Sequence, residues 1–118
     1  MNKIIMRVCL ARKRMCLPRT MVHLFGNPSH LSFWYDEVHY NLIVSPATKD
    51  DLDAYEIPQY YWRSEKHSCE VARIAFLLAL QHRFRWEKDS RYIFEGFIKT
   101  PAEHPVAVFE LTNGTRLK

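Results

Sequence analysis

The chain has 118 residues, of which 47% are hydrophobic and 25% are charged, and it contains only 3 Gly. This length fits one ordinary domain or two very small units, and the composition supports a packed core and excludes a disordered tail. Its 3 Cys residues have no paired spacing, which argues against a disulfide framework and predicts a reducing, cytoplasmic location. Charges interrupt the apolar amino terminus too early for a signal peptide, and no apolar run approaches the ~18–20 residues of a membrane span. We therefore expect no membrane association.

Charge is unevenly distributed, although the net charge is only +4. Residues 1–26 contain six Lys or Arg and no acid, whereas residues 36–56 contain six acids and one Lys. A segregated basic end is typical of proteins that contact phosphate backbones or anionic lipid. We expect the polyanion to be DNA.

The first part of the chain predicts strand and then helix. Ile4–Leu10 is apolar with Val and Ile and predicts a strand, which Ala11–Arg14 interrupts and Met15–Leu17 resumes. Pro18 suits the first position of a helix because it has no N–H that would be left unpaired there. Gly26 suits the end of that helix, because it can adopt a left-handed conformation.

A hairpin is predicted next. Leu31–Tyr35 alternates apolar and polar residues with the period of a half-buried strand, and Asn41–Ser45 supplies the second strand. Residues 1–46 therefore form a strand–helix–hairpin unit.

Residues 47–66 form an acidic and aromatic connector. Thr48–Asp53 is typical of the capped, acidic start of a helical turn. Four aromatic residues surround Pro58 in the sequence, namely Tyr55, Tyr60, Tyr61 and Trp62, and they either pack on the core or line a groove or lid for a partner.

Residues 67–118 predict a helix followed by a second hairpin. Cys69–Phe84 is the strongest helical stretch, and its apolar residues lie on more than one face, so we expect burial on several sides. Tyr92–Ile98 and Val106–Leu111 predict the hairpin, and Asn113-Gly114 a turn with a stub of chain beyond. The order repeats that of residues 1–46. Residues 67–111 are therefore either a degenerate copy of the first unit or part of an α+β domain that places a hairpin after each helix.

The same apolar patterns predict which side chains are buried. The expected core comprises Leu24, Phe25, Phe33, Leu42, Val44 and the helix over residues 71–80, with Cys9 and Cys16 as small buried residues. We expect Trp34, Trp62 and Trp86 in the core or at an interface.

No catalytic constellation is recognisable. His67 and Cys69 are two residues apart, but no second cluster has ligand spacing, so we interpret the pair as incidental. Asp50, Asp51 and Asp53 lack the Gly turn and distal Glu of a calcium loop. There is no phosphate-binding Gly loop and no nucleophile elbow. We predict no enzyme activity, no cofactor and no metal.

One stretch resembles a known family. Residues 14–26 read Arg-Met-Cys-Leu-Pro-Arg-Thr-Met-Val-His-Leu-Phe-Gly. This is similar to the signature of the AbrB/SpoVT-type swapped-hairpin DNA-binding family: a basic residue, alternating apolar residues, Pro, and a short helix ending in an apolar residue and Gly. The resemblance covers about residues 4–46, with a hairpin ending near Pro46. It departs at Lys13 and at Ser29-His30, where the family often has Gly and Gly-Asp.

The resemblance implies a β-rich α+β fold in which two units interlock their hairpins into a small barrel. If residues 67–111 are a degenerate copy, one chain forms an intrachain pseudo-dimer; otherwise two chains pair as a homodimer. It also implies a DNA-binding transcriptional regulator that contacts double-stranded DNA through a basic strand–loop face. The expected DNA-binding residues are Arg7, Arg12, Lys13, Arg14 and Arg19.

Two alternatives use the same residues differently. In an antitoxin-like protein, the basic unit would bind DNA while residues 47–118 hold a partner protein. In a protein-interaction module, the basic end would meet an acidic protein and no nucleic acid. A folded carboxy-terminal part favours the regulator, because antitoxin tails tend to be extended and weakly folded.

Overall fold

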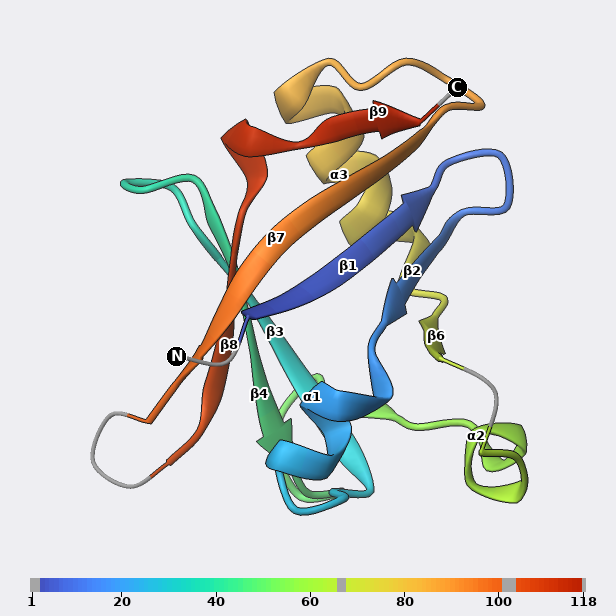
Figure 1. Ribbon diagram of the computed structural model, residues 1–118, viewed down its shortest axis with the longest axis vertical. Coiled ribbons are helices and arrows are strands. Elements are labelled where there is room, and N and C mark those ends of the chain that lie inside the picture. Colours follow the sequence, from blue (N-terminus) through green and yellow to red (C-terminus); the bar gives the residue numbers. More distant parts are fainter. Residues whose placement is uncertain (1–2, 66–67, 101–103, 118) are drawn as a thin grey trace.

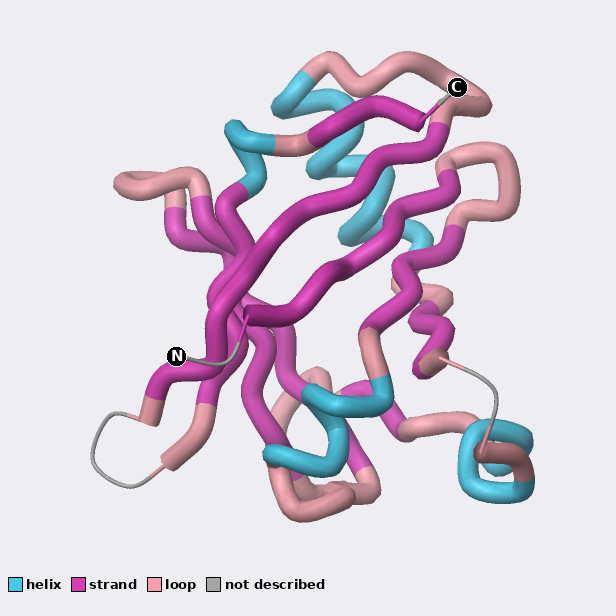
Figure 2. The backbone as a smooth tube through the Cα atoms, in the orientation of Figure 1, coloured by secondary structure: helices cyan, strands magenta, loops and turns pink. Residues whose placement is uncertain are grey.

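The computed structural model describes residues 3–65, 68–100 and 104–117 (Figure 1). Within these residues, nine strands form one antiparallel sheet that curls into a half-barrel, and three α-helices accompany it (Figure 2). This confirms the predicted strand-rich α+β class. Residues 1–46 and 67–111 do not form separate bodies, since their strands alternate in this single sheet.

The elements follow one another along the chain as β1 (Lys3–Cys9), β2 (Arg14–Leu17), α1 (Arg19–Leu24), β3 (His30–Asp36), β4 (Asn41–Ala47), β5 (Tyr55–Glu56), α2 (Gln59–Arg63), β6 (Cys69–Val71), α3 (Ile74–Phe84), β7 (Arg91–Lys99), β8 (Val106–Glu110), a 3-10 turn (Leu111–Asn113) and β9 (Thr115–Leu117). The sheet order is β5-β3-β4-β8-β7-β1-β2-β6, and β9 pairs with the first residues of β7.

Alternation within the strands builds the core. In β1 the side chains of Ile4, Met6 and Val8 are buried, whereas those between them face outward. Helix α3 lies behind β7 and β1 in the view of Figure 1 and buries Leu77 and Leu80 in the same core. Burial of such side chains removes apolar area from water and is the main favourable contribution to folding.

The connections that follow the two longer helices, α1 and α3, share one geometry. A left-handed residue ends each helix: Gly26 with φ of 83° after α1, and Arg85 with φ of 55° after α3. In both, two backbone N–H groups return to helix carbonyls in the Schellman pattern. The bonds are Gly26 to His23 (2.9 Å) and Asn27 to Val22 (3.0 Å) after α1, and Arg85 to His82 (3.4 Å) and Trp86 to Gln81 (3.1 Å) after α3.

Six of the eight strand pairings are kept when the two halves of the chain are exchanged. Under the exchange β1, β2, β3 and β4 take the places of β5, β6, β7 and β8. The β1–β7 pair then becomes β5–β3, and the β3–β4 hairpin becomes β7–β8. The β4–β8 and β2–β6 pairs map onto themselves, centred on Ile43 opposite Val108 and on Cys16 opposite Glu70. An approximate two-fold axis therefore crosses the sheet at these two places.

The symmetry is incomplete in two respects. Where β1 and β2 form a hairpin, β5 and β6 are connected through the Tyr55 hydroxyl, which lies 3.1 Å from the backbone N of Ala72 and 3.5 Å from the carbonyl of Glu70. Strand β9 has no counterpart among the described strands.

Three predicted elements are corrected by the structure. The stretch Cys69–Phe84 is not one helix: its first three residues form β6, which buries Cys69 and Val71 and completes the hydrogen bonds of β2. The segment Thr48–Asp53 is a set of turns, in which the Asp51 carboxylate accepts the Thr48 N–H at 2.7 Å. The stub after Asn113-Gly114 forms β9 against β7.

Burial is also corrected at several positions. Phe25, Leu42 and Val44 are buried as predicted, but Leu24 lies on the solvent side of α1 and is 41% exposed. Helix α3 is not buried on several sides as predicted: Leu77 and Leu80 are buried, but Ile74 and Leu78 are 44% and 42% exposed. Cys9 and Cys16 are half-buried because their strands turn these positions to the outer face.

Candidate nucleic-acid interface

The β1–β2 turn carries three successive cations. Arg12 and Lys13 are exposed, and Lys13 adopts a left-handed φ of 53° in a tight turn closed by its N–H bond to the Leu10 carbonyl. The Arg14 guanidinium lies over the turn and donates to the carbonyls of Arg12 and Lys13, both at 3.2 Å. Arg14 therefore holds the turn that presents the other two.

Two more arginines share the outer face beside this turn. Arg7 of β1 is exposed and lies between its cross-strand partners Ile93 and Cys16. One row along, Cys9 lies between Arg14 of β2 and Arg91 of β7. We define the basic face as Arg7, Arg12, Lys13, Arg14 and Arg91.

Arg91 was not among the predicted site residues. It begins the second predicted hairpin, far from the basic amino-terminal segment in the sequence. Its place depends on the pairing of β1 with β7, which no local pattern indicates. Residues 87–91 balance two acids against two cations, so local charge gave no signal for it either.

Glu70 is an acid that reaches the basic face. Its carboxylate is 3.8 Å from the Arg12 guanidinium, and the Arg12 side chain remains 68% exposed. Exposed pairs of this kind contribute about 0–1 kcal/mol and are screened by salt. Arg12 can therefore leave Glu70 for a phosphate at little cost.

Arg19, a predicted DNA contact, is instead engaged with α2. Its guanidinium donates to the carbonyls of Tyr61 (3.2 Å) and Ser64 (2.7 Å) and lies 4.1 Å from the centre of the Tyr61 ring. Burial raises the pKa of Tyr61, and the charge of Arg19 partly opposes that rise. These contacts join α1 to α2, so we assign Arg19 to the support of the fold.

A shallow groove lies next to the basic face. It has a volume of about 540 Å³ and is lined by Ile5, Arg7, Cys16, Pro18, Ser68 and Ile93. Burial, with a smaller contribution from Glu70, raises the pKa of the Cys16 thiol, so this thiol is neutral at physiological pH. The groove therefore combines one cation with apolar walls.

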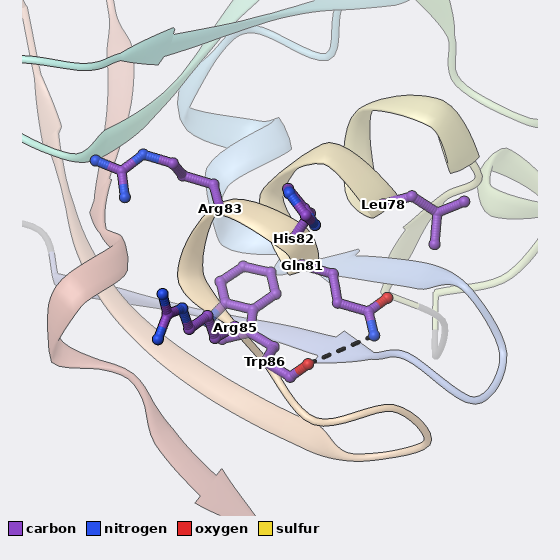
Figure 3. Close-up of a pocket in the computed structure, with 6 residues that line it drawn as sticks. All are labelled: Leu78, Gln81, His82, Arg83, Arg85 and Trp86. Atoms are coloured by element: carbon purple, nitrogen blue, oxygen red, sulfur yellow. Dashed lines mark hydrogen bonds between the residues drawn. The ribbon is translucent and has the colours of Figure 1, made fainter.

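A second depression of about 700 Å³ lies at the end of α3 (Figure 3). Gln81 donates to the Trp86 carbonyl at 3.4 Å, and Arg83 and Arg85 extend to the side opposite Leu78 (Figure 3). The Arg83 guanidinium lies 5.2 Å from the centre of the Tyr40 ring. Because these arginines point away from the Gln81 side of the depression, they do not converge on a bound group there.

His, Cys, Asp and Glu side chains, which can bind metals or act in catalysis, are present in the described part of the chain. No group of three His, Cys, Asp or Glu residues lies close enough there to hold a metal ion. Burial raises the pKa of Cys69 to about 12, which makes it a poor nucleophile. Its predicted neighbour His67 lies outside the described residues.

None of the helices formed by residues 3–65, 68–100 and 104–117 has the length and apolar character needed to cross a membrane.

Comparison with protein-family models, with curated protein sequences and with solved structures found no match to this chain.

Proposed function

We propose that the protein is a DNA-binding transcriptional regulator that contacts duplex DNA through the basic face. The observation that carries the proposal is the convergence of arginines from three strands, Arg7 from β1, Arg14 from β2 and Arg91 from β7. Neighbouring strands are about 4.8 Å apart, so Arg14 and Arg91 span about 10 Å. That width suits contact with several phosphates, each of which releases counterions when a cation neutralises it.

We further propose that the fold is of the AbrB/SpoVT swapped-hairpin type, with one chain supplying both units of a pseudo-dimer. The exchangeable strand pairings and the matching helix ends support this assignment. The two units then differ in charge: the place of Arg7 opposite Ile93 is taken in the second unit by Glu56 opposite His30. One half of the pseudo-dimer would therefore hold the DNA.

Binding of a protein partner by residues 47–118 is a second candidate function. It is favoured by apolar side chains that this part exposes, namely Tyr60 (42%), Trp62 (39%), Ile74 (44%) and Leu78 (42%). An antitoxin-like protein would combine this surface with the basic face, whereas an interaction module would not bind DNA.

The test is fluorescence anisotropy of labelled duplex DNA at about 50 and about 200 mM salt. The variant is Arg12→Ala/Lys13→Ala, which spares Arg14 because that side chain holds the turn. Lys49→Ala/Arg63→Ala removes the same charge from exposed positions of the connector and is the control.

We expect affinity to fall by about 10³-fold between the two salt concentrations, with a log–log slope of several units. The Arg12/Lys13 variant should bind more weakly and lose about two units of slope, since each lost phosphate contact removes about one. The control should match the parent. Indifference to DNA at the lower salt concentration, or equal losses in both variants, would overturn the proposal and favour the protein-interaction module.

A further inference from the structure

Four apolar side chains form a continuous row on the outer face of the sheet. Trp34 of β3 lies opposite Ile43 of β4, Ile43 opposite Val108 of β8, and Val108 opposite Phe97 of β7. Their chain neighbours Phe33, Leu42, Ala107 and Phe109 point the other way, into the core. Trp34 is 63% exposed, and the other three are half-buried. We call these four residues the apolar row.

The row is symmetric about the approximate two-fold axis. Exchange of the two halves places Ile43 on Val108, because that pair maps onto itself. It also places Trp34 on Phe97, since each is the hairpin partner of one member of the central pair. The row therefore reads aromatic, β-branched, β-branched, aromatic, with the axis at its centre.

A row of this kind is more than a scattered exposed side chain. Single exposed apolar residues are ordinary, but contiguous ones mark interaction sites, and Trp is among the residues most enriched in binding hot spots. Core packing does not require this row, since the opposite face of the same strands supplies the core. The exposed Trp34, together with the half-buried residues beside it, is therefore available to a partner surface.

The flanks of the row differ in charge. Two residues along the strands on one side lie Asp36, Asn41, Glu110 and Glu95; on the other side lie Ser32, Ser45, Val106 and Lys99. Two copies can face each other through a two-fold axis that runs parallel to the row. In that arrangement the acidic flank of each copy lies against the flank of the other copy that carries Lys99. Rotation about the perpendicular direction would set acid against acid. The first arrangement places complementary charges across the contact.

We propose that the apolar row is a contact between two copies of this chain, which bind face to face with row on row. A two-fold contact uses the same patch on both molecules, so the patch must be complementary to itself. A symmetric apolar row with one acidic flank and one flank that carries Lys99 meets that requirement. This dimer differs from a strand-swapped one, because each chain keeps its own complete sheet.

The contact area is small, so the affinity between the two copies should be modest. Stable interfaces bury about 800 Å² on each partner, more than four side chains and their rims supply. We therefore expect a concentration-dependent dimer with a dissociation constant on the order of micromolar.

Sedimentation velocity of the full chain without DNA tests the proposal over about 1–300 μM, a range that brackets this constant. The variants are Trp34→Ser and, independently, Phe97→Ser at the symmetric position. Leu52→Ser removes a side chain that is 90% exposed and lies outside the row, and it serves as the control. Circular dichroism and thermal melts establish that each variant folds.

The parent chain and the Leu52 variant should dimerise alike, and the dissociation constant of each row variant should rise at least tenfold. A parent that stays monomeric over this range would overturn the proposal and leave the row to another partner. A dimer that both row variants leave intact would place the contact elsewhere. Equal weakening by Leu52→Ser would indicate non-specific association and would also overturn it. None of these results depends on DNA binding.

Discussion

The two places where the approximate two-fold axis crosses the sheet carry opposite chemistry. Around Ile43 and Val108 the outer surface is apolar, and around Cys16 and Glu70 it is polar and adjoins the basic face. The backbones at both places are antiparallel strand pairs related by the same exchange. Side chains that face inward at both places must fill the same core. Side chains that face outward do not pack in it, so their chemistry can differ between the two places. In this fold, the residues that determine function are therefore expected among those that face outward.

Gly96→Val should disturb both faces at once and have the largest effect on stability. A Cβ at Gly96 would lie 2.5 Å from the Phe109 ring and 2.5 Å from the Val108 carbonyl, and β7 contributes to both faces. Overpacking of this severity costs about 3 kcal/mol. Chemical denaturation measures the loss in the free energy of unfolding. Glu95→Val, on the exposed side of the same strand, is the matched control, and equal losses would refute the close packing.

Arg19→Ala should show whether the Arg19 side chain stabilises the fold or contacts DNA. Loss of two charge-assisted bonds to carbonyls and of the ring contact with Tyr61 should lower the free energy of unfolding by about 2 kcal/mol. Arg19→Lys should not restore it, because an ammonium cannot reproduce the two bonds of the planar guanidinium. DNA affinity of the folded fraction should stay unchanged. A folded variant with weakened DNA binding would return Arg19 to the basic face.

Stability should fall at alkaline pH because of Cys69, a buried residue of β6 that lies opposite Leu17 of β2. Its folded-state pKa of about 12 is above the ordinary value of 9.0. The thiol stays protonated in the folded chain while the unfolded chain loses its proton, so stability is fully present below pH 9 and is lost as pH rises toward 12. Urea denaturation at a series of pH values measures this loss, and Cys69→Ala should make it shallower. An equally steep loss in that variant would exclude Cys69 as the cause.

Glu70→Gln should make the basic face more positive and produce the smallest of these effects, a modest change in DNA affinity. Removing the acid 3.8 Å from Arg12 frees that cation and lowers local negative charge. DNA affinity should rise by a few-fold, in line with the ~0–1 kcal/mol worth of an exposed pair. The anisotropy titration at low salt checks it. Reduced affinity would show that Glu70 orients Arg12 and does not compete for it.

Local patterns predicted much of the fold. The apolar stretch Ile4–Leu10, with its Val and Ile, located β1, and the two hairpins appeared near their predicted positions. The helix from Ile74 was predicted, but its start was placed too early because Cys69 and Val71 suit a buried strand as well as a helix. Only the need of β2 for a hydrogen-bonded neighbour decides between the two, and that is a tertiary requirement.

The candidate site was predicted in part. Charge along residues 1–26 indicated Arg7 and the turn cations, because a run of like charge is visible without knowing the fold. Arg19 belongs to the same run, yet α2 packs beside it and engages its guanidinium. Arg91 and the apolar row depend on which strands become neighbours across long stretches of chain. Sequence spacing carries no record of those pairings.

The most direct test of the account is a backbone amide NMR titration of the ¹⁵N-labelled protein with a short DNA duplex at low salt. We predict shifts that gather at Arg7, Arg12–Arg14 and Arg91, while Trp34, Ile43 and Phe97 stay in place. Shifts centred on the apolar row, or no shifts at all, would contradict the claim that DNA binds the basic face and not the apolar row.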